Sequence, residues 1–131
     1  MKRQKVSTGT DWEKLAGYSR AVRAGSHIFV AGTTSVDENG EIAGSGDIYL
    51  QTKFIFRKIE AALKQCGSSL EDIVRTRMFV TDIKKWKDAA KAHGEIFGSI
   101  RPASTLVEVS SLVDENLLIE IEADAVTDQH H

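Results

Sequence analysis

The sequence predicts an α+β fold in which two long helices lie on one face of a mixed β-sheet. The first observation is the segment 117–125, where apolar residues alternate with mostly acidic ones, as in a half-buried strand. The second is the apolar spacing of 45–67 and 83–97, which is typical of amphipathic helices. The third is the order of the elements along the chain, which is strands, helix, strand, helix, strand, strand.

The strands are bounded by turn residues. Two strands are expected at 18–22 and 26–31, around a turn at Ala24-Gly25. Asn39-Gly40 is a strong turn signal that joins short strands at 35–36 and 41–42. Further strands are expected at 74–80 and, as a final pair, between 101 and 126. In the strand at 74–80 we expect the buried residues to be Val74, Thr76, Met78 and Val80.

Both helices carry start and stop signals. Ser45 or Asp47 is expected to cap the first helix, and Gly67 supplies a left-handed stop. The second helix is expected to follow a cap at Thr81 or Asp82 and to stop at Gly98. The buried side of the first helix contains Ile48, Ile55, Ile59, Ala62 and Cys66, and that of the second contains Trp86, Ala89, Ala90, His93 and Phe97.

Composition limits the class of protein. The chain has 131 residues with 41% hydrophobic content, so we expect a single domain over 1–131 with its core at about 17–126. A net charge of −2 gives no overall attraction for nucleic acid or for anionic membrane. The lone Cys66, the absence of an apolar leader and the absence of a membrane-length segment predict a cytoplasmic protein. His130 and His131, either native or a tag remnant, are left out of the fold prediction.

The second face of the predicted sheet is unusual in composition. It is expected to carry Arg75, Arg77, Phe79, Leu106, Glu108, Leu118, Glu120 and Glu122. This set is too apolar for an idle solvated surface and too charged for the core of a monomer. Arginines that face glutamates across a subunit interface would explain both properties. The alternative is a solvated face with ordinary cross-strand ion pairs, each contributing about 0–1 kcal/mol.

A few side chains are candidates for chemistry. Glu120 can position water or relay protons if its surroundings raise its pKa, or it is an ordinary ion-paired surface glutamate. Arg101 can bind a carboxylate bidentately, or it is an ordinary loop arginine. His93 is expected to be a hydrogen-bonded core residue, and Cys66 an inert buried thiol. No phosphate loop, zinc spacing or dinucleotide fingerprint is present, so no metal is expected.

Several segments, taken in order, resemble the Rid superfamily (RidA/YjgF/YER057c/UK114). They lie at 17–19, 28–32, 46–52, 61–74, 79–82, 102–103 and 119–123. The resemblance implies a chorismate mutase-like fold and a barrel-like homotrimer with ligand clefts between subunits. It also implies a cofactor-free hydrolase that deaminates reactive enamines and imines. In this pattern Tyr18 lines the cleft, the backbone at Gly32-Thr33 holds the substrate, and Glu120 orients water or moves protons.

The chain departs from the deaminase pattern at one group of positions. Ser104 stands where the family has an arginine that binds the substrate carboxylate. Leu106 replaces a frequent cysteine, and Ala90 replaces a frequent asparagine. The resemblance therefore indicates a divergent subgroup that lacks the deaminase arginine. Arg101 is expected to take over part of the anion recognition, although strand alternation places it opposite Ser104.

Three functions follow from these residues. The first is a Rid-like hydrolase acting on enamine or imine intermediates of small metabolites. The second is a non-catalytic trimer whose clefts bind a small carboxylate or metabolite, and Ser104 favours this alternative. The third, a ribonuclease or translation inhibitor, is disfavoured because the chain is acidic and shows no basic aromatic groove.

Overall fold

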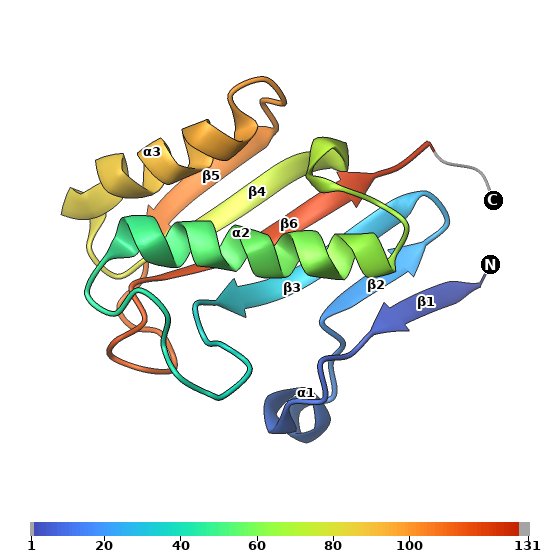
Figure 1. Cartoon of the computed structure of the whole chain (residues 1–131), viewed down its shortest axis with the longest axis horizontal. Helices are drawn as coiled ribbons and strands as arrows, with labels where there is room; N and C mark the ends of the chain where they lie inside the picture. Colours follow the sequence, from blue (N-terminus) through green and yellow to red (C-terminus); the bar gives the residue numbers. More distant parts are fainter. Residues whose placement is uncertain (1, 129–131) are drawn as a thin grey trace.

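The computed structural model describes residues 2–128 and shows a six-stranded sheet beneath two long helices (Figure 1). The strands are β1 (Arg3–Val6), β2 (Ala21–Ala24), β3 (His27–Thr34), β4 (Ile73–Val80), β5 (Ala103–Glu108) and β6 (Ile119–Val126). The helices are α1 (Asp11–Ala16), α2 (Ile48–Gln65) and α3 (Trp86–Phe97), with 3-10 turns η1 (Leu70–Asp72) and η2 (Ile83–Lys85). The predicted α+β class is confirmed.

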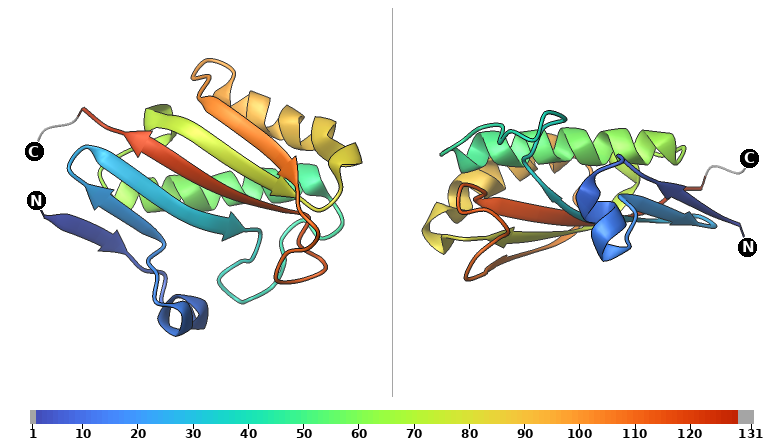
Figure 2. Two further views of the ribbon diagram at one scale, coloured as in Figure 1. Left: turned by 180° about the vertical axis from the view of Figure 1, so that it is seen from behind. Right: turned by 90° about the horizontal axis from the view of Figure 1, so that it is seen from below.

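The sheet is mixed, in the order β1-β2-β3-β6-β4-β5. Its neighbouring strands are antiparallel except β4 and β5, which are parallel and are connected through α3. Both α2 and α3 lie on one face, and the view from behind shows the other face free of helices (Figure 2). Within residues 2–128 no helix is long and apolar enough to cross a membrane.

Helix α2 covers the centre of the sheet. Asp47 caps it by accepting a hydrogen bond from the amide of Leu50 at 3.1 Å, and Gly67 follows it with φ 76°. The helix begins at Ile48, because 43–46 form turns. The predicted inward residues Ile48, Ile55, Ile59, Ala62 and Cys66 are all buried. They pack against the buried alternate residues of β6, Ile119, Ile121, Ala123 and Ala125.

Helix α3 packs against α2 through aromatic side chains. Phe56 of α2 meets Phe97 edge-on, with ring centroids 5.0 Å apart, and meets the His93 ring at 5.7 Å. The helix ends at Phe97, but Gly98 keeps a right-handed conformation with φ −54°. The left-handed residue of this turn is Arg101, with φ 55°.

Two predictions about the sheet faces are wrong. Val74 is exposed because the register of β4 with β6 shifts between Ile73 and Arg75, which turns Ile73 inward instead. Leu106 pairs in register with the buried Met78, so Leu106 and Glu108 lie on the helix side of the sheet. The parallel pairing of β5 with β4 decides which residues of β5 face the helices. The sequence of an exposed edge strand does not indicate that side, because its residues do not alternate clearly between apolar and polar.

The open face carries ion pairs within the chain. Arg77 approaches Glu122 at 3.2 Å and Asp124 at 3.3 Å, both from the neighbouring strand β6. The ion pairs of Arg77 are thus cross-strand pairs, as in the solvated-face alternative. Apolar side chains lie on the same face, since Phe29 and Val107 are 49% and 42% exposed.

The N-terminal segment forms structure that the sequence analysis did not predict. Strand β1 adds an edge to the sheet, and α1 follows with Thr10 as its cap. The buried Glu13 accepts hydrogen bonds from Ser7, Thr8 and Thr10. Residues 18–20 lie between α1 and β2 rather than in a strand.

Replacing Phe56 with alanine is expected to destabilise the fold by about 3–5 kcal/mol, because a fully buried ring at the α2–α3 contact is lost. Urea unfolding at fixed protein concentration measures this change. Leu50→Ala on the same helix is the control, since Leu50 is 50% exposed and should cost no more than about 0.5 kcal/mol. Equal effects of the two changes would contradict the packing described for Phe56.

Candidate functional site

Glu120 lies on the open face, over the backbone of Gly32. In the sheet it pairs with Thr34 of β3 and Phe79 of β4. The register between β3 and β6 shifts between Val30 and Thr33, so Gly32 lies in an irregular stretch. A Cβ atom at Gly32 would clash with Oε2 of Glu120. Glycine is therefore needed for the carboxylate to approach the strand so closely.

Arg20 fixes the irregular stretch of β3. Its Nη1 donates to the carbonyl oxygen of Gly32 at 2.9 Å and to Oγ1 of Thr33 at 3.1 Å. The Thr33 hydroxyl donates in turn to the carbonyl oxygen of Ala31 at 2.8 Å. Arg20 is 9% exposed, and its Nε lies 4.0 Å from Oε2 of Glu13. The Thr33 hydroxyl is thereby occupied inside the chain, so the part of Gly32-Thr33 that remains for a ligand is backbone.

Two carboxylates near Arg20 have oppositely shifted pKa values. Burial raises the pKa of Glu120 above its ordinary value, with a further rise from Glu122 and an opposing effect of Arg20. Burial also acts to raise the pKa of Glu13, but hydrogen bonds from Thr8, Ser7 and Thr10 outweigh it and lower that pKa. Glu13 therefore stays ionised, while Glu120 is suited to gain and lose a proton.

Tyr18 completes this cluster, which we call the Glu120 cluster (Tyr18, Arg20, Gly32, Thr33 and Glu120). The Tyr18 ring lies 5.5 Å from the Arg20 guanidinium, in cation–π geometry, and the residue is 41% exposed. The structure thus gathers four of the residues named from the sequence, and Arg20 links them. Arg20 was not predicted as a site residue, and its sequence neighbours give no clear signal for it, since only Ala21 of the following strand is fully buried.

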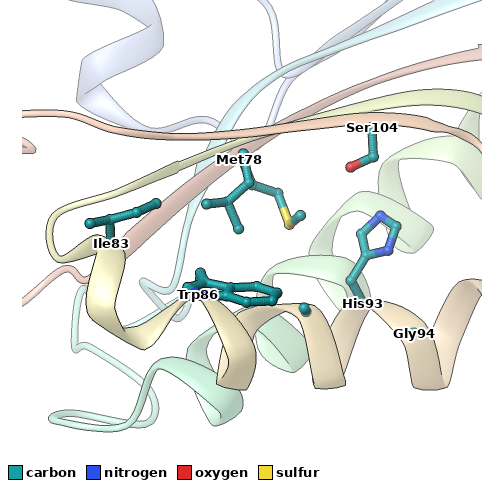
Figure 3. Close-up of a pocket in the computed structure, with 8 residues that line it drawn as sticks. Met78, Ile83, Trp86, His93, Gly94 and Ser104 are labelled. Carbon is teal, nitrogen blue, oxygen red and sulfur yellow. The ribbon is translucent and has the colours of Figure 1, made fainter.

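A second feature is a pocket of about 470 Å³ between α3 and the strands β4 and β5, which we call the α3–β5 pocket. It is lined by Met78, Ile83, Trp86, Ala90, His93, Gly94, Ser104 and Leu106. In the close-up, Met78 and Ser104 on the strands face Trp86 and His93 on the helix (Figure 3). All three positions that depart from the deaminase pattern, Ala90, Ser104 and Leu106, therefore line a single pocket.

The polar groups of this pocket form a short chain. Oγ1 of Thr76 lies 2.8 Å from Oγ of Ser104 and 2.9 Å from Nε2 of His93. His93 is a hydrogen-bonded inner residue, as expected, and burial lowers its pKa. The imidazole is consequently neutral near pH 7, and no lysine or arginine is among the described residues that line this pocket.

Ser104 and Glu120 lie on opposite faces of the sheet. Ser104 is in register with the buried Thr76, on the helix side. Glu120 is in register with Phe79, on the open side. Since neighbouring residues of a strand point to opposite faces, the two side chains do not meet within one chain.

Arg101 lies apart from both groups. It is exposed, and its Nε donates to the carbonyl oxygen of Gly98 at 3.2 Å, in the turn that follows α3. It is not among the residues that line the α3–β5 pocket.

Lys58 was also missed by the sequence analysis. Its Nζ donates to the carbonyl oxygens of Thr34 at 2.7 Å and Val36 at 2.9 Å, at the end of β3. Burial, followed by the charge of Arg20, lowers its pKa to about 8. The helical period gives a signal for it, because Lys58 stands three residues after Ile55 and four before Ala62 on the buried side.

The Glu120→Gln variant is expected to gain stability over the wild type as the pH rises. A carboxyl whose pKa is raised on folding binds more protons in the folded chain, so its contribution to stability is full below the ordinary value of 4.5 and falls above it. Glutamine lacks this dependence. Urea unfolding of both proteins at several pH values between 4.5 and neutrality measures the difference.

The control is Glu122→Gln, which removes the same charge from the same face. Because Glu122 is paired with Arg77 at 3.2 Å, this variant is expected to gain no stability at neutral pH. If instead the wild type became more stable relative to Glu120→Gln as the pH rises, the pKa of Glu120 would not be raised.

Comparison with known proteins identifies the family. The family model described as Endoribonuclease L-PSP matches residues 8–127. A solved Mycobacterium tuberculosis protein of the YjgF/YER057c/UK114 family is 48% identical, covers 96% of this chain and 100% of its own, and superposes with a TM-score of 0.86. A RutC family protein of Pyrococcus abyssi is 37% identical over 94% of this chain and 96% of its own length.

A third relative, the 3-aminoacrylate deaminase RutC of Acinetobacter baylyi, is 33% identical over 82% of this chain and 84% of its own length. The residues matched by the family model, 8–127, include strands β2 to β6, both long helices and both groups of residues described above. The chain therefore belongs to the Rid (YjgF/YER057c/UK114) superfamily.

Proposed function

We propose that the protein is a Rid-like hydrolase that deaminates reactive enamine or imine intermediates of small metabolites. The observation that carries this proposal is the partly buried Glu120, with a raised pKa, held over the Gly32 backbone beside Arg20. Such a carboxyl holds a proton more readily than an exposed glutamate, and this suits a group that must both accept and donate one. Similarity to a relative named as a 3-aminoacrylate deaminase supports the same class of reaction.

The reaction needs proton transfers and one water. An enamine becomes an imine when one proton leaves nitrogen and another joins the carbon of the C=C bond that is not bonded to nitrogen. The oxygen of water then bonds to the C=N carbon while the nitrogen gains a proton. The resulting carbinolamine loses its hydroxyl proton and expels ammonia, which leaves a carbonyl. In this scheme Glu120 accepts a proton from water as a carboxylate and returns it to nitrogen as an acid.

We further propose a chorismate mutase-like homotrimer whose clefts lie between chains. Glu120 and the α3–β5 pocket lie on opposite faces of one sheet, so they can act on one substrate only from neighbouring chains. The exposed Phe29 and Val107 give the open face the apolar character of an interface.

A second candidate function is a non-catalytic trimer that binds a small metabolite. Ser104 in place of the family arginine favours it, because this substitution removes a charged group from the α3–β5 pocket. Ribonuclease activity is disfavoured, since the open face carries the carboxylates Glu120, Glu122 and Asp124 and the net charge is −2.

Ammonia release from 2-aminoacrylate and from a panel of other imines tests the proposal. We expect weak turnover of 2-aminoacrylate, because Ser104 supplies no charge for its carboxylate. We expect clear turnover of at least one other imine, lowered about 100-fold or more in Glu120→Gln. If every imine is hydrolysed at the uncatalysed rate, the binding protein becomes the better account.

Gly32→Ala is expected to lower activity about 100-fold with little loss of stability. The new methyl group displaces only the flexible end of Glu120, and Gly32 does not have a positive φ that alanine would strain. Activity and urea unfolding are measured for this variant, for Glu120→Gln and for the double variant. If Gly32 acts through Glu120, the double variant is no less active than Glu120→Gln alone, and additive losses would refute that link.

Light scattering at micromolar concentration is expected to give the mass of three chains. The reason is that the open face presents exposed apolar residues next to an edge strand, β5, which lacks a partner on one side among the described residues. A stable monomer would remove both the trimer and the shared cleft from the proposal.

A further inference from the structure

The lining of the α3–β5 pocket is uncharged. None of its eight described lining residues carries a formal charge. Met78, Ile83, Trp86 and Leu106 supply apolar walls, and Ala90 and Gly94 are small. The guanidinium of Arg101 is bonded to the carbonyl of Gly98 and does not enter the pocket. A group that enters this pocket exchanges water for apolar walls and a few neutral polar atoms.

The hydrogen-bonded side chains Thr76, Ser104 and His93 are also neutral, and their hydrogens can be arranged in two ways. The hydroxyl of Thr76 has one hydrogen, which it gives either to Ser104 or to Nε2 of His93. In the first arrangement the Ser104 hydroxyl is free to donate to a ligand. In the second, Ser104 donates to Thr76, and its oxygen is free to accept. These three side chains can therefore form a hydrogen bond with one carbonyl, amide or hydroxyl group of a ligand, but they have no charge to balance a carboxylate.

We propose that the α3–β5 pocket binds an uncharged, largely apolar part of the substrate, so the preferred imines and enamines lack a carboxylate next to the C=N carbon. This inference rests on the proposed function and names its substrate class. A volume of about 470 Å³ accommodates a branched aliphatic or single-ring aromatic group, and the flat ring of Trp86 along one wall suits the latter. A carboxylate placed there would lose its hydration without meeting a cation.

Binding of two ligands of equal shape tests the pocket without requiring catalysis. Phenylacetamide and phenylacetate differ in charge but hardly in size. Each is titrated against the full-length protein, and the indole N–H resonance of Trp86, assigned with Trp86→Phe, reports the affinity. The wild type is expected to bind phenylacetamide at least about 10-fold more tightly than phenylacetate. Equal affinities, tighter binding of phenylacetate or no binding of either ligand would overturn the inference.

Two arginine variants make the test specific to the pocket. S104R places a cation in the pocket and is expected to reverse the preference in favour of phenylacetate. T105R adds the same charge one residue further along β5, where the side chain faces the open side of the sheet, and should keep the wild-type preference. A reversal in both variants, or in neither, would show that the charge inside the pocket does not set ligand choice.

A pair of imines then separates the inference from the proposed function. An amine oxidase makes the neutral imine from phenethylamine, and an amino acid oxidase makes the 2-imino acid from phenylalanine. We expect kcat/KM of the wild type to be at least about 10-fold higher for the neutral imine, with the order reversed in S104R. Preference of the wild type for the 2-imino acid overturns the inference but supports the deaminase. Selective binding of phenylacetamide, with turnover of neither imine nor of any other imine in the panel, overturns the deaminase and leaves the ligand class standing.

Discussion

The arrangement of this molecule depends on one constraint, which is that both long helices cover the same face of the sheet. Strand alternation then assigns every residue of β4, β5 and β6 either to the covered face or to the open one. On the covered side, Thr76 and Ser104 meet His93 beneath α3. On the open side, Glu120 lies over Gly32. The two groups that carry chemistry are thus separated by the thickness of the sheet, and this separation is the physical reason for proposing a cleft built by two chains.

Arg20 lies near two carboxylates, Glu13 and Glu120, whose pKa values are shifted in opposite directions. Its guanidinium is fixed by the carbonyl of Gly32 and approaches Glu13, whose hydrogen bonds keep it ionised. The charge of Arg20 also acts to lower the pKa of Glu120, but Glu120 receives none of those hydrogen bonds. Burial therefore dominates and raises its pKa. One arginine therefore serves as a structural partner for one carboxylate and as a modest counter-charge for another. This difference raises the proton affinity of Glu120 above that of an exposed glutamate, at some cost in stability.

The sequence predicted the buried side of an element where the apolar period is regular, and it failed where a register shift or an edge strand sets the side. Periodicity over long elements predicted the buried sides of α2 and β6, because burial on one side dictates the pattern directly. It failed at Val74, where a register shift breaks the alternation, and at Leu106, where parallel pairing of an edge strand sets the side. Helix α1 was missed although Thr10 and Glu13 have the spacing of a capping box. Glu120 was named from its place on the last strand, and Tyr18 and Gly32 through the family resemblance. The buried Arg20 beside them emerged only from the structure.

Subunit complementation tests the shared cleft most directly. Glu120→Gln disables the Glu120 cluster, and Ala90→Trp fills the α3–β5 pocket of the same chain. Each variant alone should be nearly inactive on a substrate that the wild type hydrolyses. When the two are unfolded and refolded together in equal amounts, random assembly leaves about one cleft in four with both halves intact, so about a quarter of wild-type activity should return. Mixed oligomers no more active than the separate variants would contradict a cleft formed between chains.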